Sequence, residues 1–344
     1  MKIRTFLTII LLSIMIIFPN AIKNMPNGVT TKISTNDVTI LVLMDNNFGA
    51  NYLPILNQFD EFGWTVDTAG PVETLTGCEY NSAEFEVDYL FSEISTSAYD
   101  CINILPGSSH ENLMANQNNI LNKIKTASDT GVIISAWCRA VRVLAAANVI
   151  NGKNVTGHSD YASEYAAAGA TFFSNVSPII SGNIVTCSST QFYLREMYIA
   201  MTQAIGCYED TEPVIGIIEV QTFENLSRLL TVNITDESRL RDVKAILNLI
   251  SSDDDTLPPP IALTLQDPEM DNNYSVLFAE PDDGLYSVDL KITDLFWNEY
   301  LYTNITTIVV GDINKLSLGI IITIISFPIF VCIVLIKRKK CSYK

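Results

Sequence analysis

Residues 131–149 read GVIISAWCRAVRVLAAANV, and this stretch decides the fold of the region around it. Its first part, VIISA at 132–136, is a short apolar run that is typical of a strand buried on both faces of a sheet. The residues at 139–147 predict a helix. Cys138 stands between the two. A sharp turn from a buried strand into a helix exposes its corner residue above the sheet edge, so Cys138 is a candidate nucleophile.

The same alternation of strand and helix continues on the N-terminal side of this stretch. Helices are predicted at 49–62, ended by Gly63, and at 111–127. Alternating strands and helices favour a parallel sheet sandwiched by helices, so we expect a flavodoxin-like α/β unit over residues 37–208. Its other predicted strands are VTILVLM at 38–44, WTVDTA at 64–69 and CINIL at 101–105.

A second unit is predicted at residues 213–310, where short strands follow one another without helices. The segments TVNITDESRLRDVKAILNL and YSVLFAEPDDGLYSVDLKITDLFWNEY resemble Ig-like sandwiches in the stalks of prokaryotic surface proteins. We therefore expect an all-β Ig-like sandwich. The Asp-rich turn at 253–255 is interpreted as a solvated turn, with a Ca²⁺ site as the alternative. The predicted strands lie at 214–220, 229–234, 243–249, 261–265, 274–278, 285–292 and 306–310.

The two ends of the chain predict its topology. Residues 1–21 have the basic start and short apolar core of a secretory signal peptide, with an uncleaved anchor as the alternative. Residues 316–336 contain no charge and are long enough to cross a membrane as one helix. The tail at 337–344 begins with four basic residues, which favours a cytoplasmic position. We expect a single-pass cell-membrane protein whose bulk is extracellular.

Composition narrows the classes of partner. The chain has 344 residues and a net charge of −17. A negative net charge argues against nucleic acid as a partner, because neutralising phosphates needs clustered Lys and Arg. The mean hydropathy of +0.24 is explained by the two apolar ends. Wide, irregular cysteine spacing without CxxC argues against a metal site, and we expect no metal and no cofactor. Five cysteines lie between the apolar ends, and the sequence does not decide whether they form disulfides or remain free thiols. They are Cys78, Cys101, Cys138, Cys187 and Cys207.

The α/β unit resembles a known family in several motifs. ILPGSS at 104–109, ISAWC ending at Cys138, GKNVTGH at 152–158 and SGNIVTCSS at 181–189 occur in the order found in the DJ-1/PfpI (ThiJ/PfpI) family, within the class I glutamine-amidotransferase-like superfamily. The resemblance implies an α/β domain in which Cys138 is the nucleophile. It also implies that backbone amides near Gly107 and Ser108 form an oxyanion hole.

The implied site departs from the family pattern at two positions. Asn51 stands where members usually carry a Glu that hydrogen-bonds the cysteine, and Asn cannot exchange a proton as Glu does. Arg139 stands where protease-like members carry a His. Arg139, or Arg142 after it, could add positive potential, and a helix N-terminus favours the thiolate of Cys138.

The two histidines of the chain are candidates for a base. His158 matches a histidine near the site in DJ-1-like members, and His110 follows the oxyanion turn. Either could serve if it reaches Cys138; otherwise each is an ordinary structural polar residue.

Two functions follow from these residues. The resemblance implies a hydrolase, lyase, glyoxalase-like or deglycase-like activity, or redox sensing, with a small molecule or peptide in the α/β cleft. The alternative is a non-catalytic surface binding or adhesion module with a degenerate head. Members often dimerise through this domain, so the resemblance also carries a homodimer as an expectation.

Overall fold

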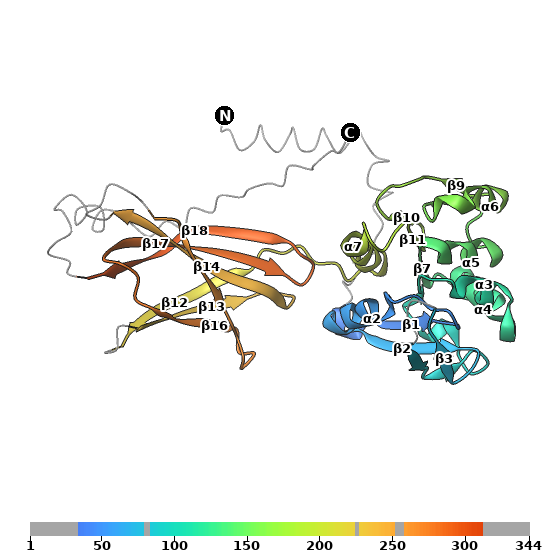
Figure 1. The fold of residues 1–344 in the computed structure, drawn as a ribbon, viewed down its shortest axis with the longest axis horizontal. Helices are drawn as coiled ribbons and strands as arrows, with labels where there is room; N and C mark the ends of the chain where they lie inside the picture. Colours follow the sequence, from blue (N-terminus) through green and yellow to red (C-terminus); the bar gives the residue numbers. More distant parts are fainter. Residues whose placement is uncertain (1–33, 79–82, 224–226, 252–257, 312–344) are drawn as a thin grey trace, which may run out of the picture.

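The computed structural model describes residues 34–78, 83–223, 227–251 and 258–311. Within them an α/β unit and a unit of antiparallel strands lie side by side (Figure 1). The signal peptide, membrane segment, basic tail and Asp-rich turn predicted from the sequence lie outside the described residues. Among the described helices, none combines the length and the apolar character that crossing a bilayer requires.

A seven-stranded sheet in the order β10-β11-β7-β6-β1-β2-β5 forms the centre of the α/β unit. Neighbouring strands are parallel, except for the antiparallel pair β10 and β11. Numbered along the chain, β2, β1, β6, β7 and β11 follow the order 2-1-3-4-5, whose switch point lies between β1 and β6. The strands are β1 (Thr39–Leu43), β2 (Thr65–Gly70), β5 (Tyr89–Leu90), β6 (Cys101–Ile104), β7 (Ile133–Trp137), β10 (Ile179–Ser181) and β11 (Ile184–Cys187).

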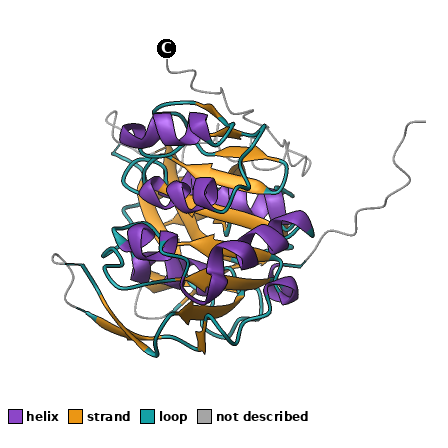
Figure 2. Cartoon of the chain, turned by 90° about the vertical axis from the view of Figure 1, so that its right-hand side faces the viewer, coloured by secondary structure: helices purple, strands orange, loops and turns teal. Residues whose placement is uncertain are grey.

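Helices cover both faces of this sheet, and Figure 2 shows several of them lying across the strands. Successive residues of a strand point to opposite faces, so Val42 and Leu43 of β1 belong to different apolar cores. Residues of α2 and α7 pack in the first core, and residues of α4 and α5 in the second. The α-helices are α2 (Tyr52–Glu61), α3 (Ser109–Met114), α4 (Ile120–Asp129), α5 (Val141–Ala146), α6 (Ala162–Ala167) and α7 (Leu194–Ile205).

Short elements complete the unit. They are the 3-10 turns η1 (Thr35–Asp37), η2 (Thr96–Ala98), η3 (Gln117–Asn119), η4 (Cys138–Ala140) and η5 (Ser159–Tyr161), the pair β3 (Thr74–Thr76) and β4 (Glu84–Glu86), and the pair β8 (Asn154–Val155) and β9 (Thr171–Phe172).

Two predicted helices differ from the structure. The helix expected at 111–127 is broken into α3 and α4, because Asn116, Asn118 and Asn119 adopt left-handed backbone conformations between them. Asn visits this region more readily than most residues. The helix expected at 139–147 begins with the tight turn η4 and becomes α-helical only at Val141.

The second unit contains two antiparallel sheets that share one apolar core. Its sheets have the orders β12-β13-β16 and β15-β14-β17-β18. Alternate residues of β13 are buried, and Leu230 and Val232 meet Val288 and Leu290 of β17 in the core. All seven strands overlap the predicted ranges: β12 (Val214–Thr222), β13 (Ser227–Thr235), β14 (Leu240–Ser251), β15 (Ile261–Leu265), β16 (Asn273–Ala279), β17 (Gly284–Asp294) and β18 (Glu299–Val310).

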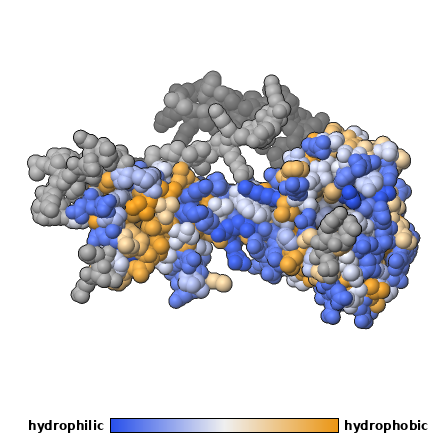
Figure 3. Space-filling view, in the orientation of Figure 1, coloured by the Kyte–Doolittle hydropathy of each residue, from blue (hydrophilic) through white to orange (hydrophobic). Residues whose placement is uncertain are grey.

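The turn between β17 and β18 joins the two units. Phe296 is buried and stacks on Phe62, which follows α2. Trp297 stacks on Tyr198 of α7, and the Arg195 guanidinium donates to the Trp297 carbonyl at 2.6 Å. Beside this contact, much of the surface between the units is hydrophilic in the view of Figure 3. Phe296 and Trp297, with the rings of Phe62 and Tyr198 on which they stack, thus form one aromatic cluster between the units, which we call the plug.

Candidate functional site

Cys138 occupies a strained corner at the end of β7. Its φ of +53° lies in the left-handed region that non-glycine residues rarely adopt, and its side chain is half-buried. The residue before it, Trp137, is extended and fully buried, and the residue after it, Arg139, is exposed. The chain therefore leaves the sheet at this residue, as the sequence predicted. Strained positions of this kind concentrate at functional sites.

The electrostatics of the thiol differ from the expectation of a favoured thiolate. The backbone amide and the charge of Arg139 both lower the pKa of Cys138. Burial outweighs them, and the net effect raises the pKa of Cys138 above its ordinary value. The turn thus stabilises the thiolate as expected, but desolvation of the ionised sulfur has the larger effect on the pKa of Cys138.

Among the described cysteines, only Cys138 has a left-handed backbone conformation. Cys101 and Cys187 are buried free thiols, and burial raises the pKa of each to about 12. Cys78 is a half-buried free thiol like Cys138, and Cys207 is buried. Cys78 therefore offers a matched control for accessibility.

The predicted oxyanion turn lies at the carboxyl end of β6. Gly107 has a φ of +124°, and a Cβ there would lie 2.5 Å from the Gly49 nitrogen. The Gly49 amide donates to the Pro106 carbonyl at 3.3 Å, which ties the turn to the segment after β1. Only glycine fits this close backbone approach. Ser108 follows as the residue that caps α3.

Asn51 does not take over the role of the missing glutamate. It caps α2, and its side-chain amide donates to the Thr190 hydroxyl at 2.7 Å. This hydrogen bond joins α2 to the loop after β11. Within the described residues, the amide makes no hydrogen bond to Cys138.

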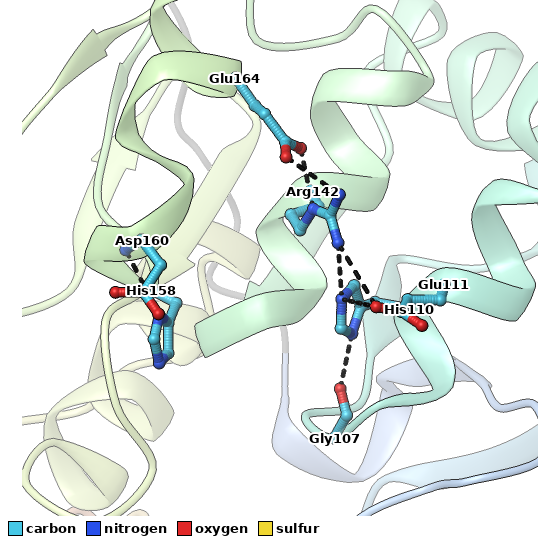
Figure 4. A network of polar contacts seen from close by, with 7 residues as sticks. All are labelled: Gly107, His110, Glu111, Arg142, His158, Asp160 and Glu164. Atoms are coloured by element: carbon cyan, nitrogen blue, oxygen red, sulfur yellow. Dashed lines mark hydrogen bonds and ion pairs between the residues drawn. The ribbon is translucent and has the colours of Figure 1, made fainter.

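His158 adjoins the site through its backbone. Its amide donates to the Cys138 carbonyl at 3.2 Å, which holds the corner in place. Its ring faces Asp160: Nδ1 accepts from the Asp160 amide at 3.4 Å and lies 3.6 Å from the carboxylate. Figure 4 shows this pair apart from the network around His110. In the part of the chain that the structure describes, the ring forms no hydrogen bond with the thiol.

His110 lies in a different network and is buried. Its Nδ1 is 2.8 Å from the Gly107 carbonyl oxygen, and its Nε2 is 3.0 Å from Nη1 of Arg142 (Figure 4). Burial lowers the pKa of His110, and the charge of Arg142 lowers it further. Both ring nitrogens are therefore occupied, which opposes the predicted role of His110 as a base for Cys138.

Arg142 is committed to partners other than the thiol. Its guanidinium donates two hydrogen bonds to Glu164 of α6, at 2.8 and 3.0 Å, and lies 4.1 Å from the ring centre of Tyr161. The hydrogen bond with Glu164 raises the pKa of Arg142. Sequence reasoning missed Glu164 of α6 and Tyr161 of η5, because only tertiary packing brings these two elements to α5.

Tyr165 is a second residue of α6 that the sequence did not single out. Its side chain is fully buried, yet its hydroxyl makes no hydrogen bond within the described residues. A Cβ on Gly157 would lie 2.9 Å from this hydroxyl, and His158 beside Gly157 bonds the Cys138 backbone. Burial raises the pKa of Tyr165, and the ionised form of Cys138 raises it further. A buried donor without a partner therefore lies near the thiol.

Asp45 is a further buried polar residue, and it follows the carboxyl end of β1. One carboxylate oxygen accepts from the Asn46 amide at 2.7 Å, and the other has no partner among the described residues. Burial raises the pKa of Asp45 to about 6. Within the described residues, no group of three or more His, Cys, Asp or Glu side chains is arranged to hold a metal ion.

A surface hollow of about 340 Å³ lies beside β4 and β5, and its lining does not include Cys138. Its walls carry the carboxylates of Glu73, Glu86, Asp88 and Glu93. This hollow is therefore not the ligand cleft that the sequence predicted beside Cys138.

Comparisons with known proteins relate residues 38–200 to one family. These residues match the family model described as the DJ-1/PfpI family. Protein DJ-1 homolog D of Arabidopsis thaliana is 25% identical over 114 residues, a match that spans 32% of this chain and 29% of the relative's length.

Solved structures of the same group resemble the α/β unit. A ThiJ/PfpI domain protein from Brachyspira murdochii is 22% identical, with 51% of this chain and 97% of that chain covered and a TM-score of 0.44. Drosophila melanogaster DJ-1beta is 16% identical, with 51% and 92% covered and a TM-score of 0.45. The family match and the parallel α/β fold agree with the resemblance found in the sequence: residues 38–200 match the DJ-1/PfpI family model, and an antiparallel-sheet unit follows them.

Proposed function

We propose that the DJ-1/PfpI domain acts through reversible addition of the Cys138 thiol to a small reactive carbonyl compound. The observation that carries this proposal is the corner itself: a half-exposed thiol at a strained φ, bonded by the Arg139 amide. Such strain persists only where the surrounding structure supports it. The family likeness of residues 38–200 adds weight to this cysteine as the reactive group.

The chemistry of the surroundings favours an aldehyde over an amide as the substrate. Addition forms the S–C bond, breaks the carbonyl π bond and moves the thiol proton through water to the new hydroxyl oxygen. This gives a thiohemiacetal and expels no leaving group. Amide or peptide cleavage needs an acid that protonates the leaving amine. Among the described side chains, neither histidine nor Asn51 is hydrogen-bonded to the thiol in a way that would supply one.

The raised pKa of Cys138 affects both chemistries that the family resemblance implies. Oxidation to a sulfenic or sulfinic acid and addition to a carbonyl both start from the thiolate. A thiol kept mostly protonated is therefore expected to react slowly in either case, and the proposed adduct forms slowly and reversibly.

A second function, a binding head without catalysis, rests on a specific observation. Asn51 replaces the proton-exchanging residue and is bonded to Thr190. In this alternative the site at the sheet edge would bind a small molecule or peptide, and Cys138 would be structural.

The experiment that decides between them uses the full-length chain and methylglyoxal. We expect a reversible adduct at Cys138, or turnover, in the wild type and in Cys78→Ser, and neither in Cys138→Ser. Mass spectrometry locates the adduct, and loss of the aldehyde measures turnover. An unmodified Cys138 at millimolar aldehyde would reject the addition chemistry and favour the binding head.

We also propose the location and domain plan that the sequence suggests. Residues 1–21 would direct export, residues 316–336 would span the membrane and residues 337–344 would stay in the cytoplasm. The units at 37–208 and 213–310 would then lie outside the cell as head and stalk. Resistance of the protein to alkaline extraction from membranes, with protease access to both units on intact cells, is the expected result. Release into the soluble fraction would contradict it.

The unit at 213–310 is proposed to be Ig-like. Its sheets of three and four strands around one core support this assignment. Self-association of the head, which the family resemblance suggests, would appear as a concentration-dependent mass in solution.

A further inference from the structure

We infer that Cys138 and Cys187 form a redox pair: oxidation of the Cys138 thiol by hydrogen peroxide leads to a disulfide bond with the Cys187 thiol. The inference does not rest on carbonyl addition, because it requires only that the peroxide reaches the half-buried Cys138. Both thiols are free in the structure, which is therefore the reduced form of the pair. The disulfide would reversibly withdraw Cys138 from the proposed reaction.

The pairing of β7 with β11 sets the distance between the two backbones. The strands lie side by side and are parallel (Figure 1), and Cys187 is the Cα partner of Trp137. Trp137 is extended, with φ −112° and ψ +133°, so the Cα atom of Cys138 lies where a continued strand would place it. With strands about 4.8 Å apart and a rise of about 3.3 Å per residue, the Cα atoms of Cys138 and Cys187 are roughly 6 Å apart. Disulfide-bonded cysteines have Cα separations of about 4.4–6.8 Å.

The left-handed conformation of Cys138 turns its side chain toward the face of Cys187. Trp137 and Cys187 both pack in the first core, and side chains alternate across a strand, so a Cys138 that continued β7 would point to the other face. Its φ of +53° differs from the parallel-strand value of about −120° by almost half a turn about the N–Cα bond. This rotation carries the Cβ atom of Cys138 back to the face that Cys187 shares.

The electrostatics of Cys187 agree with this placement. Burial is the main cause that raises the pKa of Cys187 to about 12, and the charge of an ionised Cys138 raises it further. Such an influence requires that the two thiols lie close to each other. Their proximity also offsets the small thiolate fraction of Cys187, because attack within one molecule replaces a bimolecular step.

The fold keeps the other described cysteines away from this corner. Cys101 pairs with the first residue of β7, five residues before Cys138, so it lies about 16 Å away along the strand, near the opposite edge of the sheet. Cys207 interacts with Cys101. The Cys78 amide bonds the segment after β1, and β6 lies between β1 and β7. Cys187 is therefore the described cysteine that the strand pairing brings to Cys138.

Loss of the Cys187 thiol proton leaves no buried carbonyl without a partner. The thiol donates to the Ser189 carbonyl at 3.4 Å and lies 3.9 Å from the Tyr193 carbonyl oxygen. The Tyr193 amide already donates to the first of these carbonyls, at 3.2 Å, and the Met197 amide to the second, at 3.0 Å. Conversion of the thiol to a disulfide therefore avoids the cost of an unsatisfied buried acceptor.

The chemistry consumes one hydrogen peroxide and ends in two waters. The Cys138 thiolate attacks a peroxide oxygen: the S–O bond forms, the O–O bond breaks, and the leaving hydroxide takes up the proton that the thiol released. The Cys187 sulfur then attacks the sulfenic sulfur of Cys138, so that the S–S bond forms and the S–O bond breaks. The hydroxyl leaves as water with the Cys187 proton. The two sulfurs together lose two electrons, and a dithiol reductant returns them.

The test oxidises the full-length chain with hydrogen peroxide at mildly alkaline pH, where more of Cys138 is ionised. The remaining thiols are blocked with N-ethylmaleimide, and the cysteines are mapped by mass spectrometry without reduction. In the wild type we expect a cross-linked peptide pair that joins Cys138 to Cys187, and dithiothreitol should release both thiols. In Cys187→Ser we expect no cross-link, and the sulfinic acid of Cys138 should exceed that of wild type by roughly tenfold or more, because no thiol intercepts the sulfenic acid.

Cys101→Ser is the matched control, because Cys101 is also a buried free thiol whose pKa burial raises to about 12. It should leave the yield of the cross-link unchanged. In the wild type, a cross-link from Cys138 to Cys78, a sulfinic acid at Cys138 beside a free Cys187, or an unmodified Cys138 would each overturn the inference, even if C187S fails to fold. The methylglyoxal adduct of the reduced chain tests the proposed function separately, so the two can fail independently.

Discussion

The corner at Cys138 and the turn at Trp297 each place a half-buried, non-glycine residue in the same uncommon conformation, but the side chains around them differ. The two φ values are +53° and +63°. Trp297 is stacked on Tyr198, and the Arg241 guanidinium lies 4.2 Å from its ring centre on the same turn that Phe296 anchors. Cys138 is half-buried, and its thiol interacts with the Arg139 amide. The buried Tyr165 hydroxyl lies near it and has no hydrogen-bond partner among the described residues.

The difference separates structural strain from functional strain. A left-handed residue costs on the order of 1–3 kcal/mol, which the structure around it must offset. At Trp297, which is half-buried like Cys138, aromatic packing and two arginines supply the compensation. At Cys138 the compensation comes from the buried strand on one side and α5 on the other, and the thiol-bearing residue remains half-buried. The predictions below test this contrast.

Cys138→Ser should have the largest effect on chemistry. Without the sulfur, we expect the p-nitrophenyl acetate reaction of the chain to fall to the background rate of the buffer, since Ser lacks an activating base here. The free energy of unfolding should change by less than about 1 kcal/mol for this near-isosteric change. Stopped-flow release of nitrophenolate and urea denaturation measure the two quantities. Persistence of the reaction in C138S, or its loss in C78S, would assign it to another thiol.

Phe296→Ala should have the largest effect on stability. Phe296 is 1% exposed and packs between Phe62 and Tyr208, so the truncation leaves a cavity in the plug. We expect a loss of about 3–5 kcal/mol in the free energy of unfolding. Phe192→Ala is the control, because Phe192 is 71% exposed and its loss should cost less than about 0.5 kcal/mol. A cost below 1 kcal/mol for F296A would show that the plug does not hold the units together.

Asp45→Asn should stabilise the protein at neutral pH. The pKa of Asp45 is about 6 in the folded chain and 3.8 without burial, so the unfolded chain ionises first as pH rises. Stability is therefore lost between about pH 4 and pH 6, by up to roughly 3 kcal/mol. D45N should remove this loss and equal wild type near pH 3.

Thermal unfolding across this range provides the measurement. Asp129→Asn, at an exposed surface pair with Lys125, is the control and should shift stability by less than about 1 kcal/mol. Equal pH profiles for D45N and wild type would mean that Asp45 stays solvated.

The pH dependence of alkylation sharpens the contrast at the thiol itself. Because burial raises the pKa of Cys138 above its ordinary value of 9.0, the thiolate fraction should rise about tenfold per pH unit through pH 8 without levelling. Iodoacetamide labelling of Cys138, followed by mass spectrometry in C78S, measures this. A plateau below pH 8 would mean that the Arg139 amide and charge outweigh burial.

Tyr165→Phe should have the smallest effect on stability. The hydroxyl it removes is buried without a partner, so the free energy of unfolding should stay equal or rise by about 1 kcal/mol. Tyr193→Phe removes a hydroxyl that donates to the Asn175 carbonyl, and it should cost about 1 kcal/mol instead. If the free hydroxyl serves the site, Y165F also slows adduct formation at Cys138. Destabilisation of Y165F beyond Y193F would reveal a hidden structural bond.

The sequence predicted the corner at Cys138 and the turn at Gly107, but not the side-chain contacts around them. Cys138 and Gly107 could be named because a buried strand before each one predicts a turn at the sheet edge. The partners of His110 and Asn51 could not, since Arg142 is 32 residues from His110, and Thr190 is 139 residues from Asn51. No local pattern encodes such pairings. Glu164 and Tyr165 could not be predicted for the same reason, because they are far in sequence from Arg142 and Cys138, which they approach in the fold.

Local sequence patterns determined the succession of strands and helices along the chain, its division into two units and the strand-to-helix corner at Cys138. They can do so because apolar periodicity and turn residues act over a few neighbouring positions. Tertiary structure alone decided which polar groups meet at that corner, that His110 faces a carbonyl and an arginine, and that burial sets the protonation of Cys138. These properties depend on desolvation and on contacts between distant segments, and both arise only when the chain has packed.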